Sequence, residues 1–196
     1  MFYLFKDQFL YDVIQEAMNV HFQGLIYRER NAGKDIDAHM IEKGFNNQIG
    51  IHPETGFVFG GNDANCGTWM DKMGSSDKAG NRGRPTTPRD GSAVELVGLL
   101  TSCLRFLQKM SDNGVYPYKC VERISKDGIK ATWTFKEWAD RIVHNFEKHF
   151  FVGNEKEPLI NKHGIYKDTV GATQPWCDYQ LRCNFPIAMV AVSICK

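Results

Sequence analysis

The segment FPIAMVAVSIC, residues 185–195, constrains the fold more than any other stretch of this chain. It is apolar nearly all round, and a helix without a polar face has to be packed against other elements on every side. Residues 92–110 and 135–150 predict two further helices, each with a single apolar stripe and therefore one packed face. This combination predicts a mainly α fold with the last helix in its interior.

The other predicted helices have recognisable boundaries. Residues 4–23 form an amphipathic pattern that ends before a glycine. Asp90 or Ser92 is suited to cap the second helix, because both side chains accept hydrogen bonds from the backbone N–H groups of a first turn. Thr134 and Glu137 have the spacing of a capping box, which predicts the start of the third helix.

Two short hairpins and one long loop separate these helices. Residues 49–61 alternate in polarity around a Pro-Glu-Thr-Gly turn, and residues 119–133 contain an Asp-Gly turn at positions 127 and 128. Residues 61–92 are dominated by turn formers, which predicts a loop. Loops longer than about 12–15 residues are usually functional or disordered. The Trp, Arg, Asn and Asp content of this one favours a binding site.

Composition excludes several classes of function. The formal net charge of +1 gives no support for electrostatic binding to nucleic acid or to a membrane surface. No apolar run approaches the roughly 18 residues of a transmembrane helix, and the apolar N-terminus is interrupted by Lys6 and Asp7, unlike a signal peptide. The six cysteines include no C-x-x-C pair. We therefore expect a cytoplasmic chain with free thiols, no metal and no cofactor, and its oligomeric state is not predicted.

The tetrapeptide RGRP, residues 82–85, matches the core of an AT-hook. An extended Arg-Gly-Arg segment is able to enter a narrow A/T-rich minor groove. Such hooks need a basic and disordered setting, whereas acidic residues flank this one on both sides. Nucleic-acid binding is therefore an alternative that the sequence does not favour.

The segment GTWMDKMG, residues 67–74, carries the clearest chemical signal. Glycoside hydrolysis needs two carboxyl groups, one of which is protonated near neutral pH. An aspartate titrates near pH 3.9 in water, so burial against an aromatic wall is one way to keep it protonated. Trp69 supplies such a wall for Asp71, and an indole face also packs on a sugar ring. The alternative is that Asp71 is an ordinary turn residue, as most aspartates in Gly-rich loops are.

Longer motifs identify a family. The chain contains RERNAG, ETGFVFGGNDANCGTWMDKMG, NRGRPTTPRDGSAVELVGL, GIYKDTVGA, PWCDYQLR and NFPIAMV. Together they resemble the C-terminal amylo-α-1,6-glucosidase domain of the eukaryotic glycogen debranching enzymes. The resemblance extends from about residue 10 to about residue 192. It implies a partial (α/α)6 toroid, in which paired helices surround a pocket and long loops with short β-hairpins bind sugar.

The resemblance also implies a reaction and its residues. The family domain hydrolyses, with inversion, the single α-1,6-linked glucose at a trimmed glycogen branch point, and the complete enzymes also carry a 4-α-glucanotransferase domain. The partner is therefore glycogen or its limit dextrin. The aspartate of the TWMD motif, Asp71, is the implied general acid. The implied substrate-binding residues are Trp69, Arg30, Asn31, Arg89, Glu95, Asp178, Arg182 and Asn184.

Each of these residues also has a structural alternative, and the chain departs from the family in two ways. Glu95 would suit the first turn of any helix, and Asp178 and Arg182 could form a surface ion pair. Cys183 stands where the family commonly has proline. The family's general base belongs to a segment beyond residue 196, so residues 1–196 are expected to be an incomplete domain that hydrolyses nothing alone. A non-catalytic or vestigial glycan-binding protein is the alternative function.

Overall fold

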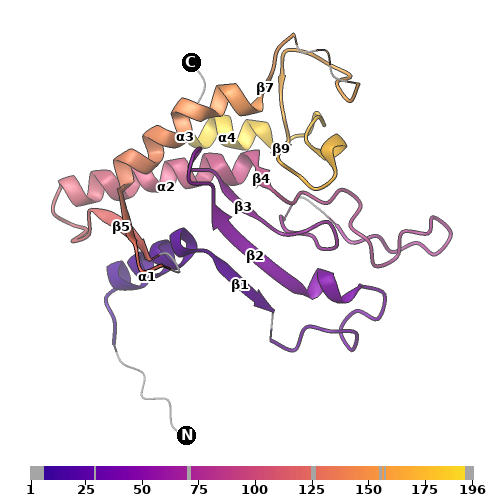
Figure 1. Ribbon diagram of the computed structural model, residues 1–196, viewed down its shortest axis with the longest axis horizontal. Helices are drawn as coiled ribbons and strands as arrows, with labels where there is room; N and C mark the ends of the chain where they lie inside the picture. Colours follow the sequence, from indigo (N-terminus) through magenta and orange to yellow (C-terminus); the bar gives the residue numbers. More distant parts are fainter. Residues whose placement is uncertain are drawn as a thin grey trace, which may run out of the picture.

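The computed structural model describes residues 7–28, 30–69, 72–124, 127–154, 156 and 158–192. Among them are helices and strands in a mixed arrangement, with many of the strands very short (Figure 1). The α-helices are α1 (Leu10–Gln23), α2 (Val94–Asp112), α3 (Phe135–Phe150) and α4 (Phe185–Val192), and η1 (Glu42–Phe45) and η2 (Pro175–Cys177) are short 3-10 helices. The strands are β1 (Leu25–Arg28), β2 (Asn46–Ile51), β3 (Val58–Gly60), β4 (Ser92–Ala93), β5 (Cys120–Ile124), β6 (Lys130–Thr134), β7 (Phe151–Val152), β8 (Ile165–Tyr166) and β9 (Thr169–Val170).

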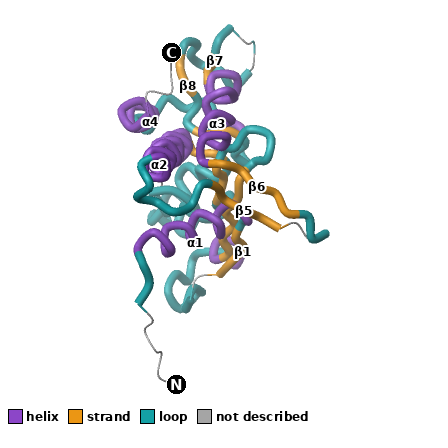
Figure 2. Tube along the Cα trace, turned by 90° about the vertical axis from the view of Figure 1, so that its left-hand side faces the viewer, coloured by secondary structure: helices purple, strands orange, loops and turns teal. Residues whose placement is uncertain are grey.

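Helix α2 packs against both α3 and α4 and lies between them in the view of Figure 2. Its approach to α4 is close, because a Cβ atom built on Gly98 would lie 2.7 Å from both Cα and Cβ of Ala188. Helix α1 lies apart from this layer and packs on strands β5 and β2. The described helices thus form one three-helix layer and one separate helix.

Both predicted hairpins are confirmed. Strands β1, β2 and β3 form an antiparallel sheet in which Ile51 pairs with Val58 around the Pro53–Gly56 turn. Strands β5 and β6 pair from Cys120 with Thr134 to Ile124 with Lys130. This hairpin packs on α1 and α3, and its outer end extends away from the rest of the chain (Figure 2). Two further pairings, β4 with β9 and β7 with β8, join segments that the sequence had not linked.

The predicted start of α3 agrees with the structure, whereas the predicted cap of α2 differs from it. The capping box of α3 is confirmed, since Thr134 and Glu137 exchange side-chain and backbone hydrogen bonds. The proposed cap of α2 is wrong: the N-cap is Ala93, and no side chain caps it. Strand pairing is the physical reason, because β4 holds Ser92 and Ala93 extended against β9, and the N–H of Val94 donates to the Asp168 carbonyl instead.

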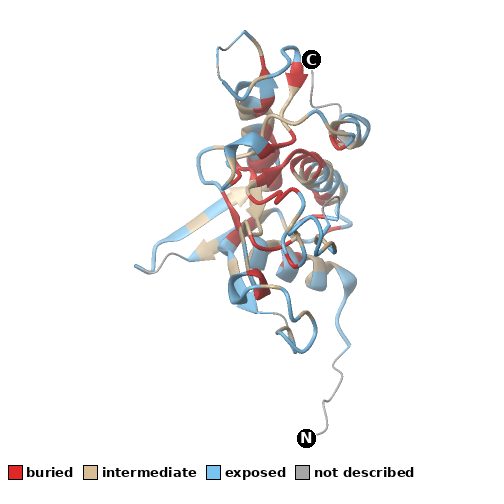
Figure 3. Cartoon of the chain, turned by 90° about the vertical axis from the view of Figure 1, so that its right-hand side faces the viewer, coloured by how far each residue is buried: buried red, intermediate tan, exposed pale blue. Residues whose placement is uncertain are grey.

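Buried side chains gather in the middle of the molecule, where α2 and α3 meet the hairpins, while the outer loops are exposed (Figure 3). The largest apolar members of this core are Trp138, Phe22, Phe57, Phe135, Phe146 and Phe150. The expectation that the last helix is buried on every side is wrong here. Ala188 is buried against α2, but Val190 is 89% exposed.

The prediction of a mainly α fold holds only in part. Helices form the largest elements, but strands β1 to β3 make a sheet and β5 with β6 make a long hairpin, so the described chain is a mixture of both. Apolar side chains are exposed on both α2 and α4, namely Leu99 and Phe106 on α2 and Val190 on α4. Completion into an (α/α)6 toroid stays a prediction.

Candidate functional site

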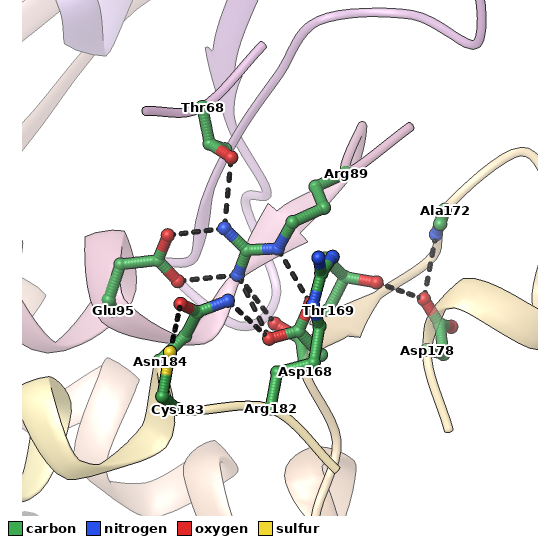
Figure 4. Close-up of polar contacts among 10 residues, drawn as sticks. All are labelled: Thr68, Arg89, Glu95, Asp168, Thr169, Ala172, Asp178, Arg182, Cys183 and Asn184. Carbon is green, nitrogen blue, oxygen red and sulfur yellow. Dashed lines mark hydrogen bonds and ion pairs between the residues drawn. The ribbon is translucent and has the colours of Figure 1, made fainter. Parts of the chain in front are cut away.

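A buried arginine, Arg89, is hydrogen-bonded to side chains from distant parts of the sequence (Figure 4). Arg89 has no exposed surface. Its Nη1 and Nη2 atoms donate to the two oxygens of Glu95 at 2.5 and 2.6 Å, in a bidentate pair. Its Nε atom donates to Asp168 at 2.6 Å, and Nη1 also donates to the hydroxyl of Thr68 at 2.9 Å. The guanidinium thus holds two carboxylates and a threonine at once.

Asp168 extends this cluster toward α4. Its Oδ1 atom accepts a hydrogen bond from Nδ2 of Asn184 at 2.7 Å, and Nη1 of Arg182 lies 3.9 Å from Oδ2. The structure therefore pairs Arg182 with Asp168 rather than with Asp178. The cluster around Arg89, called the arginine cluster below, consists of Thr68, Arg89, Glu95, Asp168, Arg182 and Asn184.

Strand pairing explains why these residues meet. Ser92 pairs with Val170 and Ala93 with Thr169, which places Asp168 directly beside the start of α2. The Asp168 carbonyl accepts from the N–H of Val94, and its own N–H donates to the carbonyl of Asp178. Glu95, one residue into the first turn of α2, then faces the same guanidinium as Asp168.

The charge of Arg89 is favoured in this setting. Burial opposes the charged form, but the hydrogen bonds and negative charges of Glu95 and Asp168 outweigh it, so the pKa of Arg89 is raised above its ordinary value. The formal charges of the two arginines and the two carboxylates in the arginine cluster sum to zero. Buried charges are tolerated in proteins when they are paired and hydrogen-bonded in this way.

Asp178 stabilises the neighbouring turn. Its carboxylate accepts from the hydroxyl of Thr169 at 2.5 Å and from the N–H groups of Gly171 and Ala172 at 3.0 and 3.1 Å. Burial raises the pKa of Asp178, and these three hydrogen bonds counteract the rise only in part. Asp178 thus fixes the loop that follows β9 and helps to position Asp168 through the backbone.

Arg30 and Asn31 are not members of the arginine cluster. Arg30 lines a cavity of about 520 Å³ together with Asn47, Asn65 and Cys66. Asn31 is exposed and has a φ of +65°, a left-handed conformation that asparagine tolerates better than most residues. A second cavity of about 520 Å³, mostly apolar, lies between α1, the sheet and α2 and is also lined by Cys66.

Asp71, the implied general acid, lies outside the described residues. Its surroundings in the sequence are well anchored on both sides. Thr68 is bonded to Arg89, and the carbonyl of Lys72 accepts from the N–H of Thr86 at 2.9 Å. Trp69 is 68% exposed, so its indole face is accessible to a ligand.

The RGRP tetrapeptide is part of a closed turn in the loop that follows. The N–H of Gly83 donates to the carbonyl of Gly74, and the N–H of Gly74 donates to the carbonyl of Arg84. A Cβ atom on Gly83 would lie 2.3 Å from the His39 backbone, so only glycine fits there. Arg82 pairs with Asp77 at 2.9 Å. These residues hold a loop together, and they do not form the extended segment of an AT-hook.

Sequence reasoning missed Thr68 and Asp168. Both lie inside segments that carried the resemblance, GTWMD and YKDTVGA, so the signal was present. The role of Asp168 depends on the pairing of β4 with β9, which connects residues almost eighty positions apart, and the role of Thr68 depends on its bond from Arg89. Within the described ranges, no group of three or more His, Cys, Asp and Glu residues gathers as a metal site would require. None of the described helices is long and apolar enough to span a bilayer.

Several of the motif segments that carry the resemblance thus meet at the arginine cluster, whereas RERNAG lies outside it. Comparison with known proteins identifies the family. The sequence model of the amylo-alpha-1,6-glucosidase family matches residues 3–195. This chain belongs to that family. The glycogen debranching enzyme of Saccharomyces cerevisiae is 42% identical to it over 190 residues, which cover 92% of this chain.

The same residues cover only 12% of the yeast enzyme. The chain therefore spans about one eighth of the length of the curated relative it matches. The family is shown by this match, whereas the activities of the complete yeast enzyme are not shown for residues 1–196.

Proposed function

We propose that this chain is part of a glycogen debranching enzyme and supplies the general-acid half of its α-1,6-glucosidase site. The supporting observation is that four segments with family motifs meet in the arginine cluster: GTWMD, TPRDGSAVE and YKDTVGA contact one another through Arg89, and QLRCNF joins them through Asp168. A cluster that ties these loops together is expected where the loops have to present a ligand site with fixed geometry. The substrate is the single α-1,6-linked glucose at a branch point of glycogen or its limit dextrin.

In this proposal Asp71 donates a proton to the glycosidic oxygen, and Trp69 offers an exposed apolar face to the sugar ring. Arg30 contributes hydrogen-bond donors from the separate cavity near Cys66, and the exposed Asn31 contributes them from the adjacent position in the chain. Arg89 and Glu95 have no exposed surface, so we assign them the task of holding the loops rather than touching the sugar. Inversion also needs a carboxylate base about 6.5–9.5 Å from the acid, and the resemblance places that base beyond residue 196.

The test uses the complete protein that contains residues 1–196, with Asp71→Asn. We expect glucose release from limit dextrin to fall by at least about a hundredfold, because proton transfer of this kind contributes roughly 10²–10⁴-fold. The 4-α-glucanotransferase activity of the same protein should be unchanged and reports that the protein is folded. Asp77→Asn is the matched control, since Asp77 is an exposed aspartate of the adjacent loop paired with Arg82. Unchanged glucose release in Asp71→Asn would remove Asp71 from the mechanism.

A non-catalytic glycan-binding protein is the second candidate, because the expected base is not among these residues. The size of the native polypeptide separates the two. An antibody against residues 60–90, used after denaturing electrophoresis of a cell extract, should detect a band several-fold heavier than 22.4 kDa if the chain belongs to a complete enzyme. A sole band near 22.4 kDa would favour binding without hydrolysis, and glycogen co-sedimentation would then measure it.

A further inference from the structure

Arg182 is the charged member of the arginine cluster whose guanidinium has N–H donors without a hydrogen-bond partner among the described residues. Its side chain is 29% exposed, whereas Arg89 and Glu95 are fully buried. Its Nη1 atom is buried and has no hydrogen-bond partner among the described residues. Because Nη1 is enclosed by the protein, a ligand can reach only the remaining N–H groups of this guanidinium, which belong to the exposed part of the side chain.

Asp168 holds Arg182 in that position. The 3.9 Å between Nη1 of Arg182 and Oδ2 of Asp168 is an ion pair without a hydrogen bond, which orients the guanidinium and leaves its donors available. Asp168 is itself fixed on three sides, by Arg89, by Asn184 and by its backbone bonds to Val94 and Asp178. It is only 2% exposed, so a sugar cannot reach it.

We propose that Asp168 is a positioning residue of the sugar site, which acts by holding Arg182 with its N–H donors directed at a hydroxyl group of the bound glucan. This inference rests on the proposed function and extends it to a residue that the family motifs alone had not singled out. Asn184 supports the same arrangement, because its bond to Asp168 fixes the chain two residues after Arg182. Asp168 touches no substrate atom, and its whole effect on binding passes through Arg182.

The test measures kcat and KM for glucose release from limit dextrin in the complete protein. Arg182→Gln should raise KM by about tenfold to a hundredfold, the range for losing a hydrogen bond from a charged group, with a smaller change in kcat. Asp168→Asn should raise KM by about tenfold, because the oriented charge is lost while its amide still fits the space. The double variant should be no worse than Arg182→Gln alone, within about twofold, since both changes remove the same interaction.

Asp90→Asn is the matched control. Asp90 is also a buried aspartate of the loop before α2, but it accepts from Thr173 and lies in no ion pair with Arg182. Its KM should stay at the wild-type value. An equal rise in KM for Asp90→Asn would mean that any loosening of these loops has the effect, and would overturn the assignment to Asp168.

Three other outcomes are decisive. Independent, multiplying effects of Asp168→Asn and Arg182→Gln would show that Asp168 does not act through Arg182. An unchanged KM in Arg182→Gln would overturn the proposal even if Asp168→Asn fails to fold, because the guanidinium of Arg182 would then make no contact with the sugar. Absence of glucose release by the wild-type protein would refute the proposed function itself, whereas normal release with unaltered variants would refute only this inference.

Discussion

Removal of the Arg89 guanidinium is the strongest perturbation of this structure that a single substitution allows. Arg89→Met keeps most of the side-chain volume and removes every donor. Glu95 loses both of its hydrogen bonds to the guanidinium, and Thr68 loses its bond as well. Asp168 loses the bond from Nε and the two bonds from Nη2, but it keeps the amide of Asn184 and the ion pair with Arg182. One buried carboxylate is left without a cation, and a second is left with a weak partner.

The expected cost follows from that inventory. Breaking a buried ion pair by removing one partner typically costs about 3–5 kcal/mol, because an uncompensated charge stays buried. Arg89 serves two carboxylates, so we expect the loss of unfolding free energy to lie at the upper end of that range. The unfolding free energy of a single domain is only about 5–15 kcal/mol, so such a loss would leave the domain that contains the arginine cluster close to unfolding.

Urea unfolding followed by tryptophan fluorescence measures this loss, and two variants make it specific. Arg89→Met with Glu95→Leu should recover part of the stability, because the uncompensated carboxylate is replaced by an apolar group of similar size. Arg28→Met is the control: Arg28 pairs with Glu42 at 2.8 Å on the surface, and its loss should cost at most about 1 kcal/mol. A similar small cost for Arg89→Met would refute the view that the cluster excludes water and depends on its charges.

Two further predictions concern the packing of α2 against α4 and a buried tyrosine of the hydrophobic core. Gly98→Val should cost about 1–3 kcal/mol of unfolding free energy in the same urea assay, because its Cβ would lie 2.7 Å from the Ala188 backbone and force α4 away from α2. Burial, with smaller effects of Tyr118, Cys103 and Asp12, raises the pKa of Tyr116 to about 12 from an ordinary value of 10.0. The neutral form is thus favoured in the folded state, so its contribution to stability is complete below pH 10.0 and is lost as the pH rises toward 12. Between these two pH values the unfolding free energy of Tyr116→Phe, measured in the same urea assay, should fall less steeply with pH than that of the wild type. Equal slopes of unfolding free energy against pH would contradict the raised pKa of Tyr116.

Local patterns predicted those parts of the fold that short stretches of sequence determine. The Pro53–Gly56 turn, the Asp-Gly hairpin and the Thr134–Glu137 capping box each depend on residues within a few positions of one another, and each is present. The cap of α2 was wrong for the opposite reason. Its outcome depends on pairing with β9, a strand more than seventy residues away, and no local preference of Asp90 or Ser92 contains that information.

In the candidate site, too, some features were predictable from the sequence and others depended on the folded structure. Motifs identified Arg89, Glu95, Arg182 and Asn184 as residues of one functional region, and four of the predicted positions do meet. Their individual roles were less predictable, because residue type does not show burial. The sequence motifs predicted that Arg89 and Glu95 bind sugar. In the structure the two side chains form a bidentate pair with each other, and neither reaches the surface. The assignment of Asp71 as the acid stays a prediction.

The arrangement of the arginine cluster suggests how such a site tolerates the Cys183 departure. Proline commonly stands at this position in the family, and its ring would restrict the backbone between Arg182 and Asn184. The structure shows a second restraint on the same backbone: the amide of Asn184 is bonded to Asp168, and Arg182 is paired with the same carboxylate. A segment held at both ends by side chains depends less on a stiff residue in its middle. Cys183 is therefore compatible with an ordered site as long as Asp168 remains in place.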